Sequence, residues 1–290
     1  MDKSIKAREE YYNNIIPTAW LTAYRRTFSD IPFSSEIFTE LDKLLKSHKF
    51  PITEDMKASQ LSPQMEARYK LINHLLKYQK GTQILEIASG FSSRGLEFCK
   101  NPKIIYVEFD LPLVIEEKQR IINIINKNKD ISNLHLVKGN ALDINSLLQV
   151  EKYFDKRKSL IIINEGLLRY LNFDEKTSIA KNVHHLLTEY SGVWITPDIT
   201  LKNVMYNENK NVKEHNKLIQ QMTKINTDKN RFDTEKQAEN FFRNLGFIIE
   251  RHSYMEVKKQ LHSPKILKIP EDIVQEMISF PIAYVMKIKE

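Results

Sequence analysis

Short apolar runs alternate with helix-length amphipathic stretches along most of the chain. Seven runs predict strands, and the first few are almost continuously apolar, as is typical of parallel strands covered on both faces. The predicted strands span residues 83–88, 104–109, 133–137, 159–163, 192–196, 247–252 and 283–288. Helix-length segments such as 113–126 and 174–190 separate most of them. The pattern therefore predicts an α/β fold with a doubly wound sheet.

Three regions depart from this plain alternation. Residues 1–62 predict an N-terminal helical cap because their apolar positions follow helical spacing, and a further helix is expected from Pro63 to about Tyr78. The polar stretch 201–230, between the fifth and sixth predicted strands, predicts an insertion in the domain 63–290. Only a short helical segment, 270–278, separates the last two strands, which favours one late antiparallel strand.

The composition is that of an ordinary globular protein, with 41% apolar and 28% charged residues in 290. The first residues mix acidic and basic side chains, so no secretory signal is expected. No uncharged apolar stretch approaches the roughly 18 residues that would cross a membrane. Cys99 is the only cysteine, which excludes an intramolecular disulfide and a cysteine-based zinc site. These features favour a cytoplasmic protein.

The net charge of +7 raises the question of a nucleic-acid partner. Residues 201–270 carry 14 Lys and Arg against 8 Asp and Glu, which is most of the excess. Their lysines are scattered among Asn and Gln without regularly spaced aromatic residues. This distribution favours a solvated surface, with a basic lid for an acidic substrate as the alternative. Neither a nucleic-acid nor a membrane partner is expected.

The first candidate for chemistry is the end of the first predicted strand, because ligands of open α/β sheets bind outside the carboxyl ends of the strands. Small residues at Ala88, Ser89, Gly90 and Ser92 permit a tight turn and a close approach of the backbone to a ligand. A helix beginning near Ser93 would present free N–H groups to an anion. The complete GxGxxG pattern of a dinucleotide binder is absent. A purely structural turn is an equally good interpretation of this segment alone.

The following strand ends carry acidic and amide side chains. Glu108 and Asp110 end the second strand about 20 residues after the turn, the spacing at which a carboxylate can hold ribose hydroxyls. Asn140 follows the third strand, where it could read an adenine edge while Leu142 packs on the ring. Glu165 emerges from a very apolar fourth strand, where a carboxylate needs donors or a cation. Solvent-facing charges at strand ends are the alternative interpretation.

The order of these pieces resembles the leucine carboxyl methyltransferase-like family of class I S-adenosylmethionine-dependent methyltransferases. That family includes carboxyl O-methyltransferases of bacterial polyketide pathways. The resemblance covers about residues 63–200 and is strongest in the acidic-Leu-Pro and Glu-Gly-Leu-Leu elements. The motifs are Glu66-Ala67-Arg68, the Gly90 turn ending in Arg94, Val107-Glu108-Phe109-Asp110-Leu111-Pro112 followed by Lys118, and Asn164-Glu165-Gly166-Leu167-Leu168-Arg169-Tyr170-Leu171.

The resemblance implies a Rossmann-like, seven-stranded and mostly parallel sheet with helices on both faces, and S-adenosylmethionine as the cofactor. Arg68 would pair bidentately with the cofactor carboxylate. Glu165 would face the methionyl amine, and Gly90 would pass close to the methionyl backbone. Glu86 and Ala88, on the same strand and turn as Gly90, are assigned to the cofactor site as well.

The resemblance also implies which residues would bind the adenosine half of the cofactor. Asp110 would hold the ribose hydroxyls, with Glu108 as the less favoured claimant. Asn140, Ala141 and Leu142 would flank the adenine. In the family the turn usually reads Leu-Gly-Ala-Gly followed by an aromatic residue, Asp and Thr. Here it reads Ile-Ala-Ser-Gly-Phe-Ser-Ser, so a glycine and the aspartate are missing.

The acceptor decides which catalytic groups are needed. A carboxylate acceptor is already anionic, whereas a hydroxyl needs a general base within roughly 3 Å of its proton. Asp198, at the end of the fifth strand, and Tyr170, beside the Glu165 element, are the predicted catalytic residues at the acceptor. Arg169, next to Tyr170, could contact the acceptor as well, and a packing role is open for each of the three. No group of acidic and histidine residues has convincing metal-ligand spacing, so no metal is expected.

The sequence thus predicts an S-adenosylmethionine-dependent O-methyltransferase acting on a carboxylate or hydroxyl of a small molecule or peptide C-terminus. A catalytically silent binding protein on the same fold is the main alternative, given the altered turn. A nucleotide-cofactor oxidoreductase would prefer the intact glycine fingerprint. An enzyme that methylates amino groups of bases would carry an Asn/Asp-Pro-Pro-aromatic turn where this chain has Asn-Glu-Gly-Leu.

Overall fold

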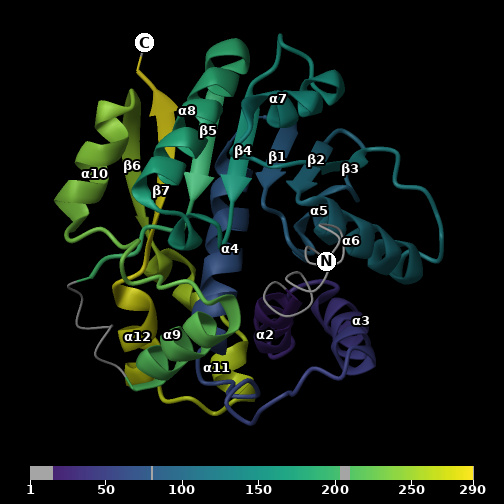
Figure 1. The fold of residues 1–290 in the computed structure, drawn as a ribbon, viewed down its shortest axis with the longest axis vertical. Helices are drawn as coiled ribbons and strands as arrows, with labels where there is room; N and C mark the ends of the chain where they lie inside the picture. The colour runs from purple at the N-terminus through teal and green to yellow at the C-terminus, as the bar shows by residue number, and fades with distance from the viewer. Residues whose placement is uncertain (1–15, 80, 203–209, 290) are drawn as a thin grey trace, which may run out of the picture.

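A computed structural model of the protein describes residues 16–79, 81–202 and 210–289, which form one seven-stranded sheet of order β3-β2-β1-β4-β5-β7-β6 (Figure 1). The strands are β1 (Gln83–Ile87), β2 (Ile105–Asp110), β3 (Leu134–Lys138), β4 (Leu160–Asn164), β5 (Gly192–Thr196), β6 (Phe247–Ser253) and β7 (Ile282–Ile288). The first five pair in parallel, whereas β7 runs antiparallel to both β5 and β6. The predicted α/β sheet with one late antiparallel strand is confirmed. Every strand lies within one residue of its predicted bounds.

The strand order places a switch point at the centre of the sheet. From β1 the chain adds β2 and β3 on one side, and then β4 and β5 on the other. The crevice between the ends of β1 and β4 is where such sheets bind ligands. In Figure 1 the arrowheads of β1, β2, β4 and β5 point towards the same lower end of the sheet, where α2, α3 and α9 lie.

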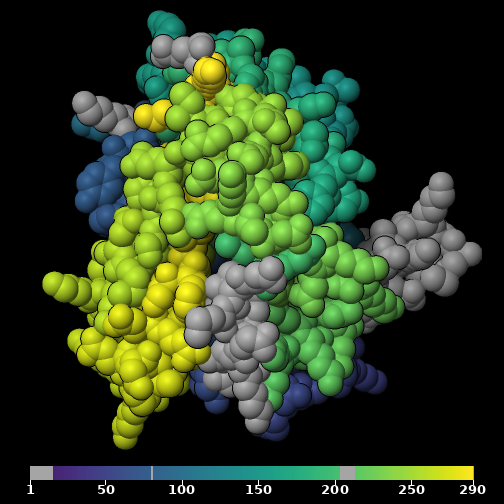
Figure 2. Space-filling view, turned by 90° about the vertical axis from the view of Figure 1, so that its left-hand side faces the viewer, coloured from purple at the N-terminus to yellow at the C-terminus, as the bar shows by residue number. Residues whose placement is uncertain are grey.

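Helices cover both faces of the sheet, which explains why the central strands β1, β4 and β5 are buried along almost their whole length. On one face, α8 (Phe173–Tyr190) and α10 (Glu235–Asn244) contribute to the hydrophobic core. On the other face, α4 (Ser62–Tyr78) and α12 (Glu271–Ser279) do so. Figure 2 shows the side of the molecule on which the C-terminal half of the chain, coloured green to yellow, covers most of the surface. The shorter or peripheral helices are α5 (Arg94–Phe98), α6 (Pro112–Ile125), α7 (Ile144–Leu147) and α11 (Ser263–Ile266).

Local signals fix where the main helices begin. The Asn172 side chain accepts the N–H of Glu175 at 2.9 Å, and the Glu175 carboxylate accepts the N–H of Asn172 at 2.8 Å, which forms a capping box for α8. Helix α6 begins at Pro112, whose fixed φ and missing N–H suit the first helical position. The Leu-Pro pair after Asp110 therefore ends β2 and starts α6, which leaves the Asp110 side chain at the strand end.

Three helices lie over the carboxyl ends of the strands: α2 (Ile16–Arg26), α3 (Ser34–Ser47) and α9 (Lys210–Thr223). Buried residues of all three pack in one hydrophobic cluster with Phe91 of the turn after β1 and Val114 of α6. This packing closes the ligand edge of the sheet from above. Residues 1–15 of the predicted cap and 203–209 of the predicted insertion lie outside the described residues, and the division into cap and domain stays a prediction.

Three features expected from the composition concern membrane-spanning helices, metal sites and the cysteine. No helix in residues 16–79, 81–202 or 210–289 is long and apolar enough to cross a membrane. In the same ranges, no three His, Cys, Asp or Glu side chains are grouped so that they could hold a metal ion. The thiol of Cys99 is free and buried.

Candidate functional site

A cavity of about 510 Å³ opens at the carboxyl ends of β1, β2 and β4, within the usual range for small-molecule sites. Its floor is formed by the turn after β1, the end of β2 and the residues after β4, and its cover by α2, α3 and α9. The cover contributes apolar side chains together with serine and threonine, whereas the floor carries most of the charged groups. Of the predicted site residues, the lining includes Arg68, Glu86, Ala88, Gly90, Asp110, Glu165 and Tyr170.

The floor of the cavity contains backbone that a ligand can approach closely. Ala88 and Gly90 have φ values of 52° and 49°, and Gly166 has a φ of 81°. Apart from the adjoining residues, no described atom lies within 4 Å of where a Cβ would stand on Gly90 or Gly166, so both face open space. Ala88 holds a left-handed conformation that costs an L-residue about 1–2 kcal/mol. This conformation explains why a glycine is usual at that position in the family the sequence resembles.

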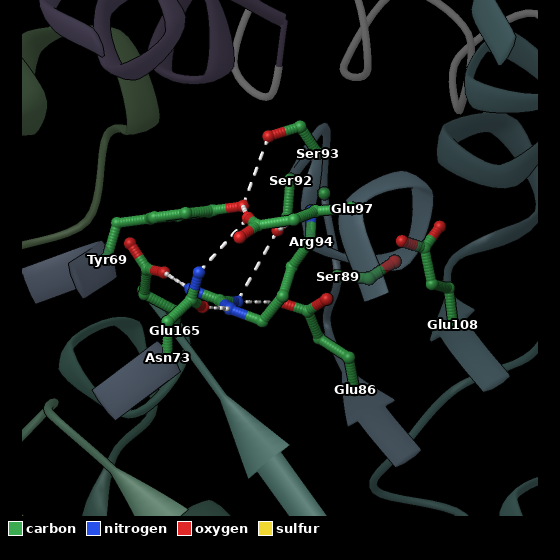
Figure 3. A network of polar contacts seen from close by, with 12 residues as sticks. Tyr69, Asn73, Glu86, Ser89, Ser92, Ser93, Arg94, Glu97, Glu108 and Glu165 are labelled. Carbon is green, nitrogen blue, oxygen red and sulfur yellow. Dashed lines mark hydrogen bonds and ion pairs between the residues drawn. The ribbon is translucent and has the colours of Figure 1, made fainter. Parts of the chain in front are cut away.

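Three arginines surround the carboxylate of Glu165 at the end of β4. Figure 3 shows one of them, Arg94, beside Glu165. Arg68 donates from Nε at 2.8 Å, Arg94 from Nη2 at 2.8 Å, and Arg26 from Nη2 to the same oxygen as Arg68. Burial by itself raises the pKa of Glu165, but the Arg26, Arg68 and Arg94 guanidiniums together hold it well below its usual range. Glu165 is therefore a permanent anion within a positively charged wall.

Arg94 links this wall to the central strand. Its Nη1 pairs with Glu86 of β1, its Nε donates to Asn73 of α4 at 2.8 Å, and its guanidinium stacks over the Tyr69 ring at 4.4 Å. Glu86 also accepts the hydroxyl of Tyr106 at 2.7 Å. Two buried carboxylates, Glu86 and Glu165, therefore hold Arg94.

Asp110 is the acidic residue that β2 presents to the cavity. Its carboxylate accepts the N–H groups of Gly90 and Leu111, each at 2.7 Å. Burial raises the pKa of Asp110, and these two N–H groups lower it in part. Glu108 does not line the cavity; it is fully buried and paired with Lys118 at 2.7 Å, and burial raises its pKa to about 7. Figure 3 shows Glu108 apart from the arginine network.

The predicted acceptor residue Asp198 lies elsewhere. It is 4% exposed and does not line the cavity. Its carboxylate accepts the Asn164 side chain at 2.7 Å and the backbone N–H groups of residues 166–168 at 2.7–3.1 Å. The sharp turn after β4 leaves these N–H groups without backbone acceptors, and the Asp198 carboxylate, two residues after β5, satisfies them. Asp198 thereby positions the segment that carries Glu165, and its position gives no support to the predicted contact with an acceptor.

The residues predicted to flank adenine form a structured loop after β3. The Asn140 side chain accepts the N–H of Leu142 at 3.0 Å, and the Ala141 carbonyl accepts the Asn182 side chain at 2.8 Å. None of Asn140, Ala141 and Leu142 lines the cavity as it stands. Their contact with adenine stays a prediction.

The sequence interpretation missed two charged or titratable residues that line the cavity: Arg26 of α2 and His215 of α9. Arg169, which the sequence placed beside Tyr170 as a possible contact of the acceptor, lines the cavity as well. Arg26 follows the buried residues Trp20 and Ala23 on the same helical stripe. His215 likewise lies four residues before the buried Ile219. A charged or titratable side chain on the apolar stripe of a helix was therefore the available signal.

Comparison with known proteins identifies the family. Among solved structures, the chain is similar to a candidate O-methyltransferase from Nostoc punctiforme, with 13% identity, a TM-score of 0.47, and coverage of 79% of this chain and 59% of that one. It is also similar to an O-methyltransferase family protein from Burkholderia thailandensis, with 9% identity, a TM-score of 0.49, and coverage of 88% and 71%. The chain thus spans less than two thirds of the length of the first of these proteins.

No curated protein sequence matches the chain significantly. The family model described as leucine carboxyl methyltransferase matches residues 29–184, which is more than half of the 290 residues. The match begins within the N-terminal helices and contains the turn after β1, the end of β2 and the Glu165 segment. The chain therefore belongs to the leucine carboxyl methyltransferase family of S-adenosylmethionine-dependent methyltransferases.

Proposed function

We propose that the protein transfers the methyl group of S-adenosylmethionine to a carboxylate of a small molecule with an apolar body. The observation that carries this proposal is the character of the cavity wall: arginines are plentiful, and each described acid or imidazole there is already engaged by donors. Such a wall suits an acceptor that arrives as an anion and gives up no proton. The acceptor's apolar body would lie against the cover formed by α2, α3 and α9.

The residues of the floor fit the cofactor. Arg68 offers a fork to its carboxylate, Glu165 an anion to its amine, and Asp110 two oxygens to its ribose hydroxyls. The open space over Gly90 and Gly166 leaves room for the cofactor to lie close to the backbone. These roles of single side chains are inferred from the family to which the chain belongs, so each needs its own test.

The cofactor supplies a methyl group on a positively charged sulfur. An acceptor carboxylate oxygen forms the new bond to the methyl carbon while the carbon–sulfur bond breaks and its electron pair stays on sulfur. One negative and one positive charge disappear and no proton moves, so the protein's task is to position the reactants and exclude water. A hydroxyl acceptor would need a base. Glu165, held by three arginines, and Asp110, which accepts two N–H groups, are poorly suited to that role.

The first test is calorimetric titration of the purified protein with S-adenosylmethionine, S-adenosylhomocysteine and NAD. We expect micromolar binding of the two adenosyl ligands and none of NAD. Failure of both adenosyl ligands to bind would overturn the proposed function. Binding without methyl transfer to any carboxylic acid tested would instead favour a silent binding protein.

Replacement of Asp110 by alanine should weaken S-adenosylhomocysteine binding by roughly 10- to 100-fold, because hydrogen bonds to a charged group are lost from a buried site. Calorimetry measures the loss directly. Replacing the exposed loop residue Asp130 by alanine removes the same charge far from the cavity and is the matched control. Equal affinities for the two variants would mean that another group holds the ribose.

We also propose that the protein acts in the cytoplasm. Its only cysteine, Cys99, is a buried free thiol, which fits a reducing compartment. Fractionation of cells that express a tagged protein tests this placement.

A further inference from the structure

His215 is held in one tautomer at the edge of the cavity. Its Nδ1 lies 3.0 Å from Nη1 of Arg25. A guanidinium can only donate, so Nδ1 must accept, and in the neutral ring the proton then resides on Nε2. Arg25 is itself fixed, because its Nε donates to the carbonyl of Ala58 at 3.2 Å. His215 therefore offers an N–H donor on the side of the ring away from Arg25.

The surroundings of His215 keep the ring neutral. Burial, and then the positive charges of Arg25, Arg169 and Arg68, hold the pKa of His215 well below its ordinary value. Near neutral pH the ring therefore carries one proton, and Nε2 cannot accept another from a substrate. His215 lines the main cavity and also a second, more polar cavity of about 290 Å³ on the side of Arg25. Within this wall it acts as a fixed donor and is not available as a base.

Arg169 adds a cation to the same wall. It lies on the 3₁₀ turn η3 (Leu168–Tyr170) and donates from Nη2 to the Asn216 side chain of α9 at 3.2 Å. Its Nε is buried and has no hydrogen-bond partner among the described residues. Within those residues, no carboxylate lies within ion-pair distance of its guanidinium. A buried, unpartnered N–H on a cation is costly, and an anionic ligand is the group that would satisfy it.

The cofactor would not neutralise this cation. S-adenosylmethionine carries one carboxylate, one ammonium and one sulfonium, so its net charge is +1. In the proposed cofactor site its carboxylate would pair with Arg68 and its ammonium with Glu165, which leaves Arg169 without an anion. The surface of the cavity that Arg169 and His215 line is mostly apolar, and Ala19, Ala23 and Ile219 of the cover contribute to it beside several threonines.

We propose that Arg169 and the Nε2–H of His215, with the ring oriented by Arg25, form the binding site for the carboxylate of the acceptor. The proposal rests on the proposed function and extends it to substrate recognition. It assigns the acceptor to carboxylic acids with an apolar chain or ring, since the anion site opens into an apolar compartment. Arg169 and His215 act as binding residues, and Arg25 acts as a positioning residue.

The test uses the full chain saturated with S-adenosylhomocysteine, titrated calorimetrically with benzoate, hexanoate and octanoate and with the amide of each. We expect at least one carboxylate to bind at least 10-fold more tightly than its amide. Arg169→Gln should weaken that binding by roughly 10- to 100-fold and leave the affinity for S-adenosylhomocysteine within about twofold. Arg157→Gln, which changes an exposed arginine on the far surface, is the matched control.

Two variants of His215 test the assigned tautomer. Glutamine can place an N–H where Nε2 stands, whereas asparagine can replace only the Nδ1 end, so His215→Gln should retain more carboxylate affinity than His215→Asn. Ring ¹⁵N shifts should identify His215 as neutral and protonated on Nε2, and Arg25→Leu should remove that preference. A merely structural role for His215 would move neither readout in this way.

The outcomes separate this proposal from the proposed function. If S-adenosylhomocysteine binds but none of the three carboxylates does, or if amides bind equally well, the anion site is refuted and the proposed function stands. If Arg169→Gln weakens S-adenosylhomocysteine as much as the carboxylates, Arg169 belongs to the cofactor site and the proposal is wrong. Failure of S-adenosylhomocysteine to bind the wild-type protein would overturn both.

Discussion

Asp198→Ala is expected to lower the free energy of unfolding by about 3–5 kcal/mol, because it strands buried donors that no other group can satisfy. The Asp198 carboxylate accepts three backbone N–H groups from residues 166–168 and the Asn164 side chain. Asn164 in turn accepts the indole N–H of the buried Trp194 at 2.7 Å. Loss of the Asp198 carboxylate would therefore disturb β4, β5 and the Glu165 segment where the three meet.

Chemical denaturation followed by fluorescence measures this change, and Asp130→Ala serves as the exposed control. The decisive comparison combines stability with methyl transfer. If Asp198→Ala is as stable as the control but loses activity, Asp198 contacts the acceptor, and the structural role assigned here is wrong.

Arg68→Ala is expected to weaken S-adenosylhomocysteine binding by about 2–4 kcal/mol, or roughly 30- to 1,000-fold. Arg68 presents a fork beside Glu165, and its removal takes away both a donor pair and the charge that would face the cofactor carboxylate. Glu165 keeps Arg26 and Arg94 as partners, so the local structure should survive. Arg68→Lys should recover only part of the loss, since an ammonium cannot form two parallel hydrogen bonds.

Calorimetric titration of Arg68→Ala, Arg68→Lys and the surface control Arg157→Ala tests this expectation, with thermal unfolding of each to check the fold. Unchanged affinity in Arg68→Ala would place the methionyl carboxylate elsewhere, with Arg26 as the next arginine on the wall. A loss of stability equal to the loss of affinity would show that Arg68 acts mainly on Glu165.

The strands were predictable because their signal is local. Each contains a short apolar run bounded by polar or helix-forming residues, and in the central strands β1, β4 and β5 burial on both faces makes that run nearly continuous. The cavity residues that lie at the ends of strands were predictable for the same reason. Gly90, Asp110 and Glu165 lie where strands stop, and the carboxyl ends of parallel strands converge on one edge of the sheet.

Contacts between distant segments could not be predicted in the same way. Glu108 and Asp110 are both acidic and two residues apart, and only the packing of Lys118 on α6 decided which of them is paired in the interior. Asp198 follows a strand end just as Asp110 does, yet the turn after β4 supplies N–H donors that take up its carboxylate. In each case, the partner that settles the role comes from another element.

The sequence by itself determined the sheet, its late antiparallel strand, and the edge at which the site forms, because hydrophobic periodicity and strand-end chemistry act over a few residues. Only the tertiary structure decided the arginine wall around Glu165 and the fixed tautomer of His215. Arg26, Arg68, Arg94 and His215 come from α2, α4, α5 and α9, and the charge that each meets depends on how those helices pack over the sheet. A buried charge takes its character from partners in space, and sequence distance alone does not specify them.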